Sequence, residues 1–326
     1  MARNENLKPD RVLRQLFSQF VSRREARLTT LMDTVRIVRE RGWTAFAFGG
    51  TPRGVFDNGR HYRPRDLDLV FDDEHFSFFE SAFERHVLKR NRFGGLHLRI
   101  ENLVIDAWPL SKTWAFREGL VQKATFENLP KTTFLNIDGI IIEVAPQRGK
   151  PRQIHEAGFF TAWQNKTLDI NLRENPFPAL CVVRTLQLSL RFGFRLSRRL
   201  AMYLSEAMNS LSLAELESTQ LSHYGRVEFS TQMLQGIHDC LRRHLATVGL
   251  FPLALFPVRP DQLELPVRTN RSSDLRGEDA QGSISHRSSV MPLSPHHRKS
   301  DDHITTNELF LDRFATSLMV GASLVR

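Results

Sequence analysis

The chain has 326 residues, enough for two modest domains and a tail, and its 45 Lys and Arg against 36 Asp and Glu give a formal charge of +9. This charge favours a polyanionic partner, and the two cysteines, Cys181 and Cys240, indicate buried thiols in a reducing compartment and not a disulfide scaffold. The polar N-terminus and the lack of a run of about 18 apolar residues argue against a secretory signal or a membrane span. We therefore expect a cytoplasmic protein without membrane contact.

The predicted elements begin with N-terminal helices in residues 1–42, where apolar side chains recur at helical spacing until Gly42 ends the pattern. A head domain of strands and helices follows in residues 43–150. Its strands are expected at 43–48, 66–71, 96–100, 103–110 and 137–144, with a short helix at 52–56 and a crossover helix at 76–88.

A helical neck domain is expected in residues 151–250, with Ser197 as an N-cap. Its helices are predicted at 159–168, 179–192, 197–208, 211–218 and 227–247. Residues 251–308 form a proline-containing linker, and its segment 268–303 is too poor in large apolar residues to order. A short apolar segment, 309–326, ends the chain. The fold class is therefore α+β: a mixed sheet flanked by helices, then an all-helical domain and a disordered tail.

Two glycines and two alternating aspartates dominate the head. Gly49 and Gly50 end the first apolar strand, and Asp66 and Asp68 follow on the second. Side chains alternate across a strand, so the two carboxylates share one face, and Mg²⁺ is commonly held by one or two carboxylates plus substrate phosphates. Glycines let backbone N–H groups approach phosphate oxygens. The pattern predicts a two-metal site for displacement at phosphorus, with Asp66 and Asp68 as catalytic ligands and an NTP as substrate.

A third carboxylate lies in a predicted hairpin. Asp106 interrupts the apolar strand 103–110, where an aspartate is costly without a cation or hydrogen-bond donors. We interpret it as a third metal ligand or a general base beside Asp66 and Asp68. The alternative is a solvent-facing position on an edge strand.

The segments 48–53 and 65–70 resemble the head domain of the DNA-polymerase-beta superfamily of nucleotidyltransferases. They are most similar to bacterial poly(A) polymerases and CCA-adding tRNA nucleotidyltransferases, whose pattern is Gly-Gly-x-x-Arg followed by Asp-x-Asp. The resemblance implies that Arg53 contacts the triphosphate. It covers about residues 40–210, because Arg184 and the segment 191–197 resemble the arginine-rich neck, and it implies that Arg184 belongs to the nucleotide site.

The chain also departs from this family. The family's Arg-Arg-Asp-Phe-Thr-x-Asn segment would fall near 131–136, where Phe134 and Asn136 remain without the paired arginine and aspartate. The base-reading neck motif Glu-Asp-x-x-Arg appears as Glu174 followed by Asn175 and, at the arginine position, Pro178. Proline has no donor with which to read a base edge. We therefore expect triphosphate and metal chemistry without the template for adding C and then A.

Basic residues gather in the neck, and two interpretations of them remain open. They either line a groove that attracts a phosphate backbone or form a solvated helix face. The cluster comprises Arg184, Arg191, Arg195, Arg198 and Arg199.

The sequence thus predicts a Mg²⁺-dependent nucleotidyltransferase that moves an NMP from an NTP to an acceptor hydroxyl and releases pyrophosphate. RNA is the first expected acceptor, which would make the protein an RNA-binding, RNA-processing enzyme. The alternatives are a protein or small-molecule acceptor, or a regulatory protein that keeps the fold without turnover.

Overall fold

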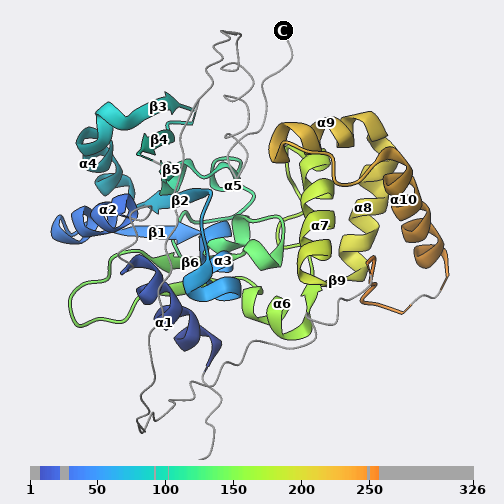
Figure 1. Ribbon diagram of the computed structural model, residues 1–326, viewed down its shortest axis with the longest axis horizontal. Helices are drawn as coiled ribbons and strands as arrows, with labels where there is room; N and C mark the ends of the chain where they lie inside the picture. The colour runs from blue at the N-terminus through green and yellow to red at the C-terminus, as the bar shows by residue number, and fades with distance from the viewer. Residues whose placement is uncertain (1–7, 23–28, 92, 102, 248–249, 257–326) are drawn as a thin grey trace, which may run out of the picture.

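The computed structural model describes residues 8–22, 29–91, 93–101, 103–247 and 250–256. Within these ranges a head built on a β-sheet stands beside a neck of helices (Figure 1). The predicted disordered segment 268–303 and the short apolar segment 309–326 lie outside the described residues.

The head contains a seven-stranded mixed sheet in the order β3-β4-β5-β2-β1-β6-β7. Its strands are β1 (Ala45–Phe48), β2 (Asp66–Phe71), β3 (Val87–Arg90), β4 (Leu96–Ile100), β5 (Leu103–Pro109), β6 (Ile140–Glu143) and β7 (Ile154–Glu156). Among the described pairs of this sheet, β2 and β5 run parallel and the rest are antiparallel. The predicted mixed sheet is thus confirmed.

The sheet is buried on both faces by different clusters. Helices α1 (Pro9–Val21), α2 (Thr29–Glu40) and α4 (Asp73–Phe83) share one apolar cluster with the inward residues of the central strands. A smaller cluster, centred on Phe48 and Trp108, covers the other face. Because side chains alternate along β2, Leu67 and Leu69 join the larger cluster, whereas Asp66 and Asp68 point to the other face.

Several predicted boundaries are wrong, and the end of the crossover helix and the start of the last head strand differ clearly from the structure. The crossover helix ends at Phe83 instead of residue 88, because Leu88 lies off the buried helical face and is 53% exposed, on edge strand β3. The last head strand starts at Ile140 instead of residue 137, since Asn136–Asp138 form a 3-10 turn, η6, before Gly139. The remaining head elements are α3 (Gly50–Asn58), η2 (Gly59–His61), η3 (Glu84–His86), η4 (Leu110–Lys112), α5 (Trp114–Arg117) and η5 (Leu129–Thr132).

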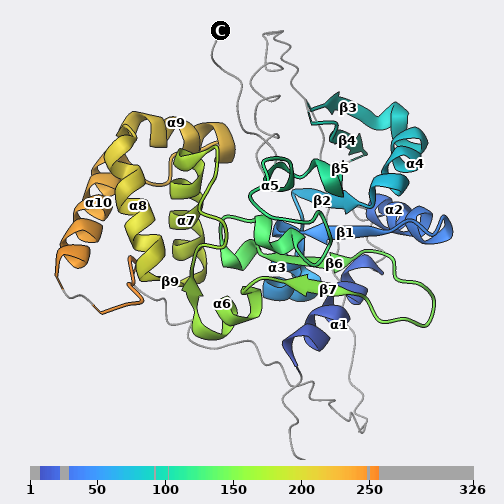
Figure 2. The same cartoon turned by 180° about the vertical axis from the view of Figure 1, so that it is seen from behind.

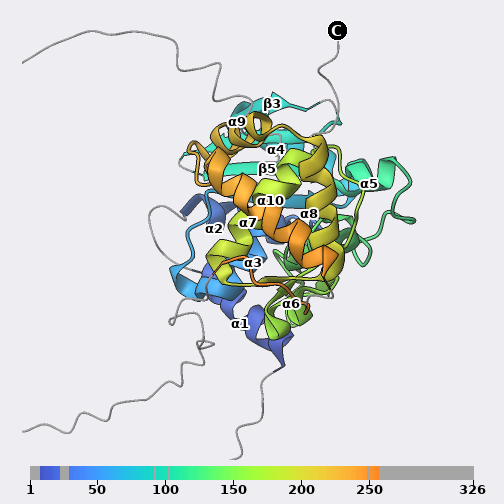
Figure 3. The ribbon, with the colours of Figure 1, turned by 90° about the vertical axis from the view of Figure 1, so that its right-hand side faces the viewer.

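The neck has its own apolar core. Its elements are α6 (Phe159–Asn165), β8 (Thr167–Leu168), α7 (Pro178–Phe192), β9 (Arg195–Leu196), α8 (Arg198–Ser210), α9 (Leu213–Tyr224) and α10 (Thr231–Ala246). Phe134, Leu135 and Ile137 of the head insert into this core. Figure 2 shows α6 between the sheet and α7, and Figure 3 shows α8 and α10 in front of the sheet.

The predicted cap of α8 is confirmed, since the Ser197 hydroxyl accepts a hydrogen bond from the backbone N–H of Leu200 at 3.1 Å. Of the helices in the described ranges, none has the length and apolarity needed to cross a membrane.

Candidate active site

Three predicted site residues meet on one face of the sheet. The parallel pairing of β2 with β5 sets Asp68 directly beside Asp106, and neighbouring strands lie only about 4.8 Å apart. Asp66 shares this face because it is two residues before Asp68. Asp68 is 2% exposed. The alternative of Asp106 as an exposed edge position is not what the structure shows, since β5 lies between β4 and β2.

Two of these carboxylates are already paired with cations or donors. The Asp66 carboxylate accepts a hydrogen bond of 2.7 Å from Arg65 Nη2, and the ring Nδ1 of His97 lies 2.7 Å from Asp106 Oδ1. Burial raises the pKa of Asp106, the contact with His97 opposes this, and the charge of Asp66 adds to the rise. A buried carboxyl with a second carboxylate beside it lies where a cation would be stabilised.

The donor set suits Mg²⁺ chemically, since it consists of carboxylate oxygens on rigid strands. In the described part of the chain, however, no three His, Cys, Asp or Glu side chains are gathered as a metal cage. Asp66 turns to Arg65 and Asp106 to His97. The residues fit the ion through the shared face of Asp68 and Asp106, and Asp66 lies on the same face with one carboxylate oxygen bound to Arg65.

The glycine turn lies at the same end of the sheet. Since β1 is antiparallel to β2 and Ala47 pairs with Leu69, the end of β1 lies beside the beginning of β2. Gly49 has a φ of 52°, which favours glycine, and its N–H donates to the Ile140 carbonyl at 3.0 Å. Helix α3 begins at Gly50, so its first free N–H groups and positive dipole end lie next to the aspartate strand.

The two arginines predicted for the nucleotide site come together, although they are 131 positions apart (184 minus 53). Arg53 on α3 and Arg184 on α7 both form ion pairs with Asp138 of η6. Burial, followed by the charge of Arg184, lowers the pKa of Arg53. The arginines predicted for the nucleotide site therefore span the boundary between head and neck.

Three residues of this region were not predicted from the sequence. Asp138 interrupts an apolar run just as Asp106 does, and the same criterion would have found it. His97 lies opposite Asp106 in the register that the predicted two-residue turn of the hairpin already defined. Tyr62 had no signal in the sequence: its ring packs against Gly54, and its hydroxyl donates to the Gly50 carbonyl at 3.4 Å.

The arginines of the basic cluster in the neck have different partners and different exposure. Arg184 faces Asp138, and Arg191 lies 3.4 Å from Asp57 on α3. Arg199 pairs with Asp169, whereas Arg195 and Arg198 are exposed. The arginines of α7 thus face the head, and those after it face outward or towards the junction.

Comparison with solved structures places the fold. A CCA-adding enzyme in complex with ATP matches with a TM-score of 0.50 and 14% identity, covering 71% of this chain and 54% of that one. The apo form I of a CCA-adding enzyme matches with the same TM-score and identity, covering 73% and 56%. The Thermotoga maritima CCA-adding enzyme complexed with tRNA gives a TM-score of 0.48 at 16% identity, covering 64% and 48%.

The described chain therefore has the head-and-neck fold of CCA-adding nucleotidyltransferases, which confirms the expected architecture. It spans about half to three fifths of the length of the structures it matches. No protein-family model matches the sequence. No curated protein matches it either.

Proposed function

We propose that the protein is a divergent, metal-dependent nucleotidyltransferase of the polymerase-beta superfamily that moves an NMP from an NTP to an acceptor hydroxyl. The observation that carries this proposal is the in-register pairing of Asp68 with Asp106, on one face of the sheet and beside the Gly49-Gly50 turn. Carboxylates for a cation and backbone donors for phosphate thus occupy the same end of the sheet.

Each part of the site has a distinct task in this proposal. Asp66, Asp68 and Asp106 hold Mg²⁺, which when bound supplies charge neutralisation at the reacting phosphate. The N–H groups at the start of α3 orient the triphosphate, and Arg53 offsets its charge. The acceptor oxygen attacks the α-phosphorus, and pyrophosphate is the leaving group.

RNA is the acceptor that we favour. The formal charge of +9 supports a polyanionic partner, and similar folds belong to enzymes described as complexed with tRNA and an ATP analogue. We place the reaction in the cytoplasm, because Cys181 and Cys240 are both free thiols.

One observation favours a second candidate, which is transfer to a protein or a small molecule. The base-reading arginine is replaced by Pro178, the first residue of α7, and the Asn175 side chain caps the local turn by accepting from the N–H of Phe177 at 2.9 Å. The entry to α7 therefore offers no guanidinium to a base edge, and a template for sequence-specific addition is missing there.

Labelled nucleotides distinguish these candidates. The full chain is incubated with each α-labelled NTP, Mg²⁺ and total RNA, and in parallel without RNA. Label on RNA supports the first candidate, and label on protein supports the second. Asp68→Ala should abolish either transfer, whereas Asp33→Ala, on the exposed surface of α2, should leave it unchanged. The enzyme proposal fails if no nucleotide is transferred, or if Asp68→Ala transfers as well as the wild type.

A further inference from the structure

Asp138 is a buried acid to which the proposed reaction assigns no task. Its carboxylate is 7% exposed and lies where the head meets the neck. Arg53 of the head forms an ion pair with one oxygen, and Nε and Nη2 of Arg184 in the neck each lie 2.8 Å from the other oxygen. A single carboxylate therefore serves two guanidinium groups.

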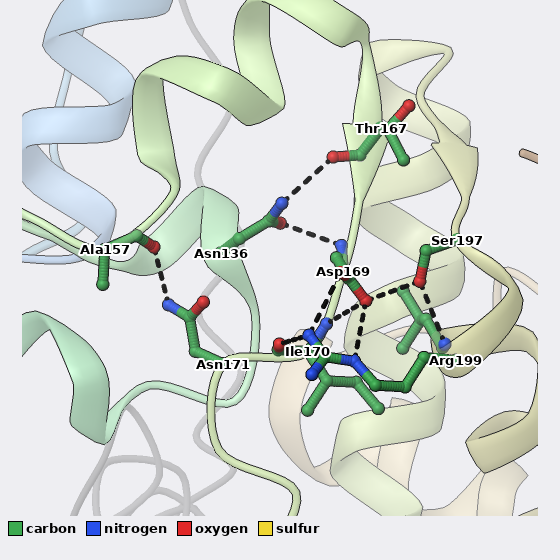
Figure 4. Close-up of polar contacts among 9 residues, drawn as sticks. Asn136, Ala157, Thr167, Asp169, Ile170, Asn171, Ser197 and Arg199 are labelled. Carbon is green, nitrogen blue, oxygen red and sulfur yellow. Dashed lines mark hydrogen bonds and ion pairs between the residues drawn. The ribbon is translucent and has the colours of Figure 1, made fainter.

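The backbone that carries Asp138 is held firmly from both sides. The Asn136 side chain accepts from the N–H of Asp169 at 3.0 Å and donates to the Thr167 carbonyl at 3.2 Å (Figure 4). Asn171 donates to the Ala157 carbonyl at 2.8 Å, and the N–H of Ala157 donates to the carbonyl of Gly139. Because η6 is fixed in this way, the long arginine side chains are the parts of the trio that are able to move.

The trio carries uncompensated positive charge. Two guanidiniums and one carboxylate sum to +1, in a place where Arg53 is 12% exposed and Arg184 is 26% exposed. Burying an excess charge is unfavourable, so binding of an additional anion would stabilise the trio of Asp138, Arg53 and Arg184. Arg191 adds a further positive charge nearby, although its own contact with Asp57 balances part of it.

The position of Arg53 indicates which anion would fit. Its Nη2 lies 3.9 Å from the point where a side chain on Gly50 would begin, so the guanidinium lies over the first turn of α3. The backbone N–H groups of that turn and the guanidinium therefore offer donors to the same bound group. An anion with several charged oxygens, such as a triphosphate, is able to contact both, and Asp138 then competes with it for Arg53.

We propose that Asp138 is an internal competitor of the triphosphate and sets the affinity of the site for it. In the free protein Asp138 binds Arg53 and Arg184 together. When a triphosphate binds, Arg53 transfers to it, and Asp138 keeps Arg184 and so retains the contact between head and neck. The assignment of triphosphate as the ligand rests on the proposed function, but the role of Asp138 is testable without any transfer reaction.

Calorimetry with inorganic tripolyphosphate and Mg²⁺ tests the proposal on the full chain. Asp138→Asn keeps the shape of the side chain and removes its charge, so tripolyphosphate should bind on the order of tenfold more tightly than to the wild type. The matched control is Asp169→Asn, which removes a carboxylate from the same junction but has Arg199 and Ser197 as partners. Its affinity for tripolyphosphate should remain that of the wild type.

Equal or weaker binding by Asp138→Asn overturns the proposal, as does equal tightening by Asp169→Asn. If neither wild type nor variant binds tripolyphosphate, this proposal and the triphosphate site both fail. Tighter binding by Asp138→Asn without transfer of any labelled nucleotide leaves Asp138 as a competitor and rejects only the enzyme.

A measurement on the wild type decides the matter if Asp138→Asn does not fold. Arginine side-chain nitrogen spectra, with the Arg53 signal assigned by Arg53→Lys, should show that signal shifting when tripolyphosphate is added. An Arg53 signal that stays in place while tripolyphosphate binds contradicts the release from Asp138.

Discussion

The aspartate strands and the junction between head and neck differ in how far apart in sequence their polar partners lie. On the strands, Asp66 is paired with its direct neighbour Arg65, and Asp106 with His97, nine residues away. At the junction, Asp138 is 85 residues from Arg53 and 46 from Arg184, and in the adjoining part of the neck Asp169 is 30 from Arg199. Pairs that are close in sequence surround the acids on β2 and β5, whereas pairs that are distant in sequence connect the head with the neck. The first region is therefore readable from short motifs, and the second depends on the complete fold.

The first prediction has the largest expected effect, which is a loss of stability in Gly139→Ala at the junction. A Cβ there would lie 2.5 Å from Asn171 Nδ2 and 2.7 Å from the Ala157 carbonyl oxygen. Since one of these atoms is backbone, η6 has to shift, and we expect the free energy of unfolding to fall by about 3 kcal/mol. Urea unfolding of the full chain measures it.

The control for this substitution is Gly236→Ala. Gly236 lies inside helix α10 with nothing within 4 Å of its Cβ position, so alanine should raise the free energy of unfolding by about 0.5–1 kcal/mol. If both alanine variants change stability in the same direction, the close packing of the junction is not what makes Gly139 necessary.

The same contrast explains which features the sequence made predictable. Helix and strand positions followed from apolar periodicity, and the strand 66–71 was predicted with the observed limits. Asp66 and Asp68 were predicted from the glycine pair and the alternating aspartates, and Asp106 because a carboxylate in an apolar strand is costly wherever the chain goes next. Arg53 and Arg184 were predicted as nucleotide-site residues, but their shared contact with Asp138 was not predictable, because no local pattern reveals that Arg184 of α7 reaches η6.

The second prediction concerns His97 on β4, which lies beside Asp106 on β5. A residue that orients a metal ligand typically contributes ten- to a hundredfold to metal affinity. We expect His97→Ala to weaken Mg²⁺ binding about tenfold. His97→Gln retains a side-chain donor and should recover most of the affinity. The shift of the melting temperature with Mg²⁺ concentration reports both, and identical behaviour of the two variants would contradict an orienting role.

The third prediction concerns the stability of Asp169→Asn, a substitution in the part of the neck that adjoins the junction. Asp169 accepts from the Ser197 hydroxyl at 2.5 Å and pairs with Arg199 at 3.0 Å. Because Arg199 is 60% exposed, solvent screens the ion pair, and we expect a loss of only about 1 kcal/mol in the free energy of unfolding.

Asp33→Asn on α2 serves as the control for Asp169, since its partner Arg36 is equally exposed but joins no second element. It should change the free energy of unfolding by only a few tenths of a kcal/mol. A loss for Asp169→Asn no greater than this would show that the contacts of Asp169 with Ser197 and Arg199 add nothing to the apolar packing of the neck.

The smallest effect is a pH dependence at Asp106, measured in EDTA. Burial raises the folded-state pKa of this carboxyl above its value in the unfolded chain, so the folded protein holds the proton more tightly. Its favourable contribution to stability is complete below about pH 4 and is lost as the pH rises through the raised pKa. Asparagine does not ionise, so Asp106→Asn should be more stable than the wild type at pH 7 and lose this advantage towards pH 4.

Adding Mg²⁺ tests whether the effect of Asp106→Asn belongs to the carboxylates on β2 and β5. A cation beside the ionised carboxylates offsets the cost of burying their charge, so Mg²⁺ should raise the melting temperature of the wild type at pH 7 more than that of Asp106→Asn. The same ion should have no such differential effect on Asp169→Asn, whose carboxylate is neutralised by Arg199. If Asp106→Asn is more stable than the wild type at every pH and with or without Mg²⁺, the carboxylates on β2 and β5 are neutralised by protein groups. They would then resemble Asp138 and Asp169, which have arginine partners.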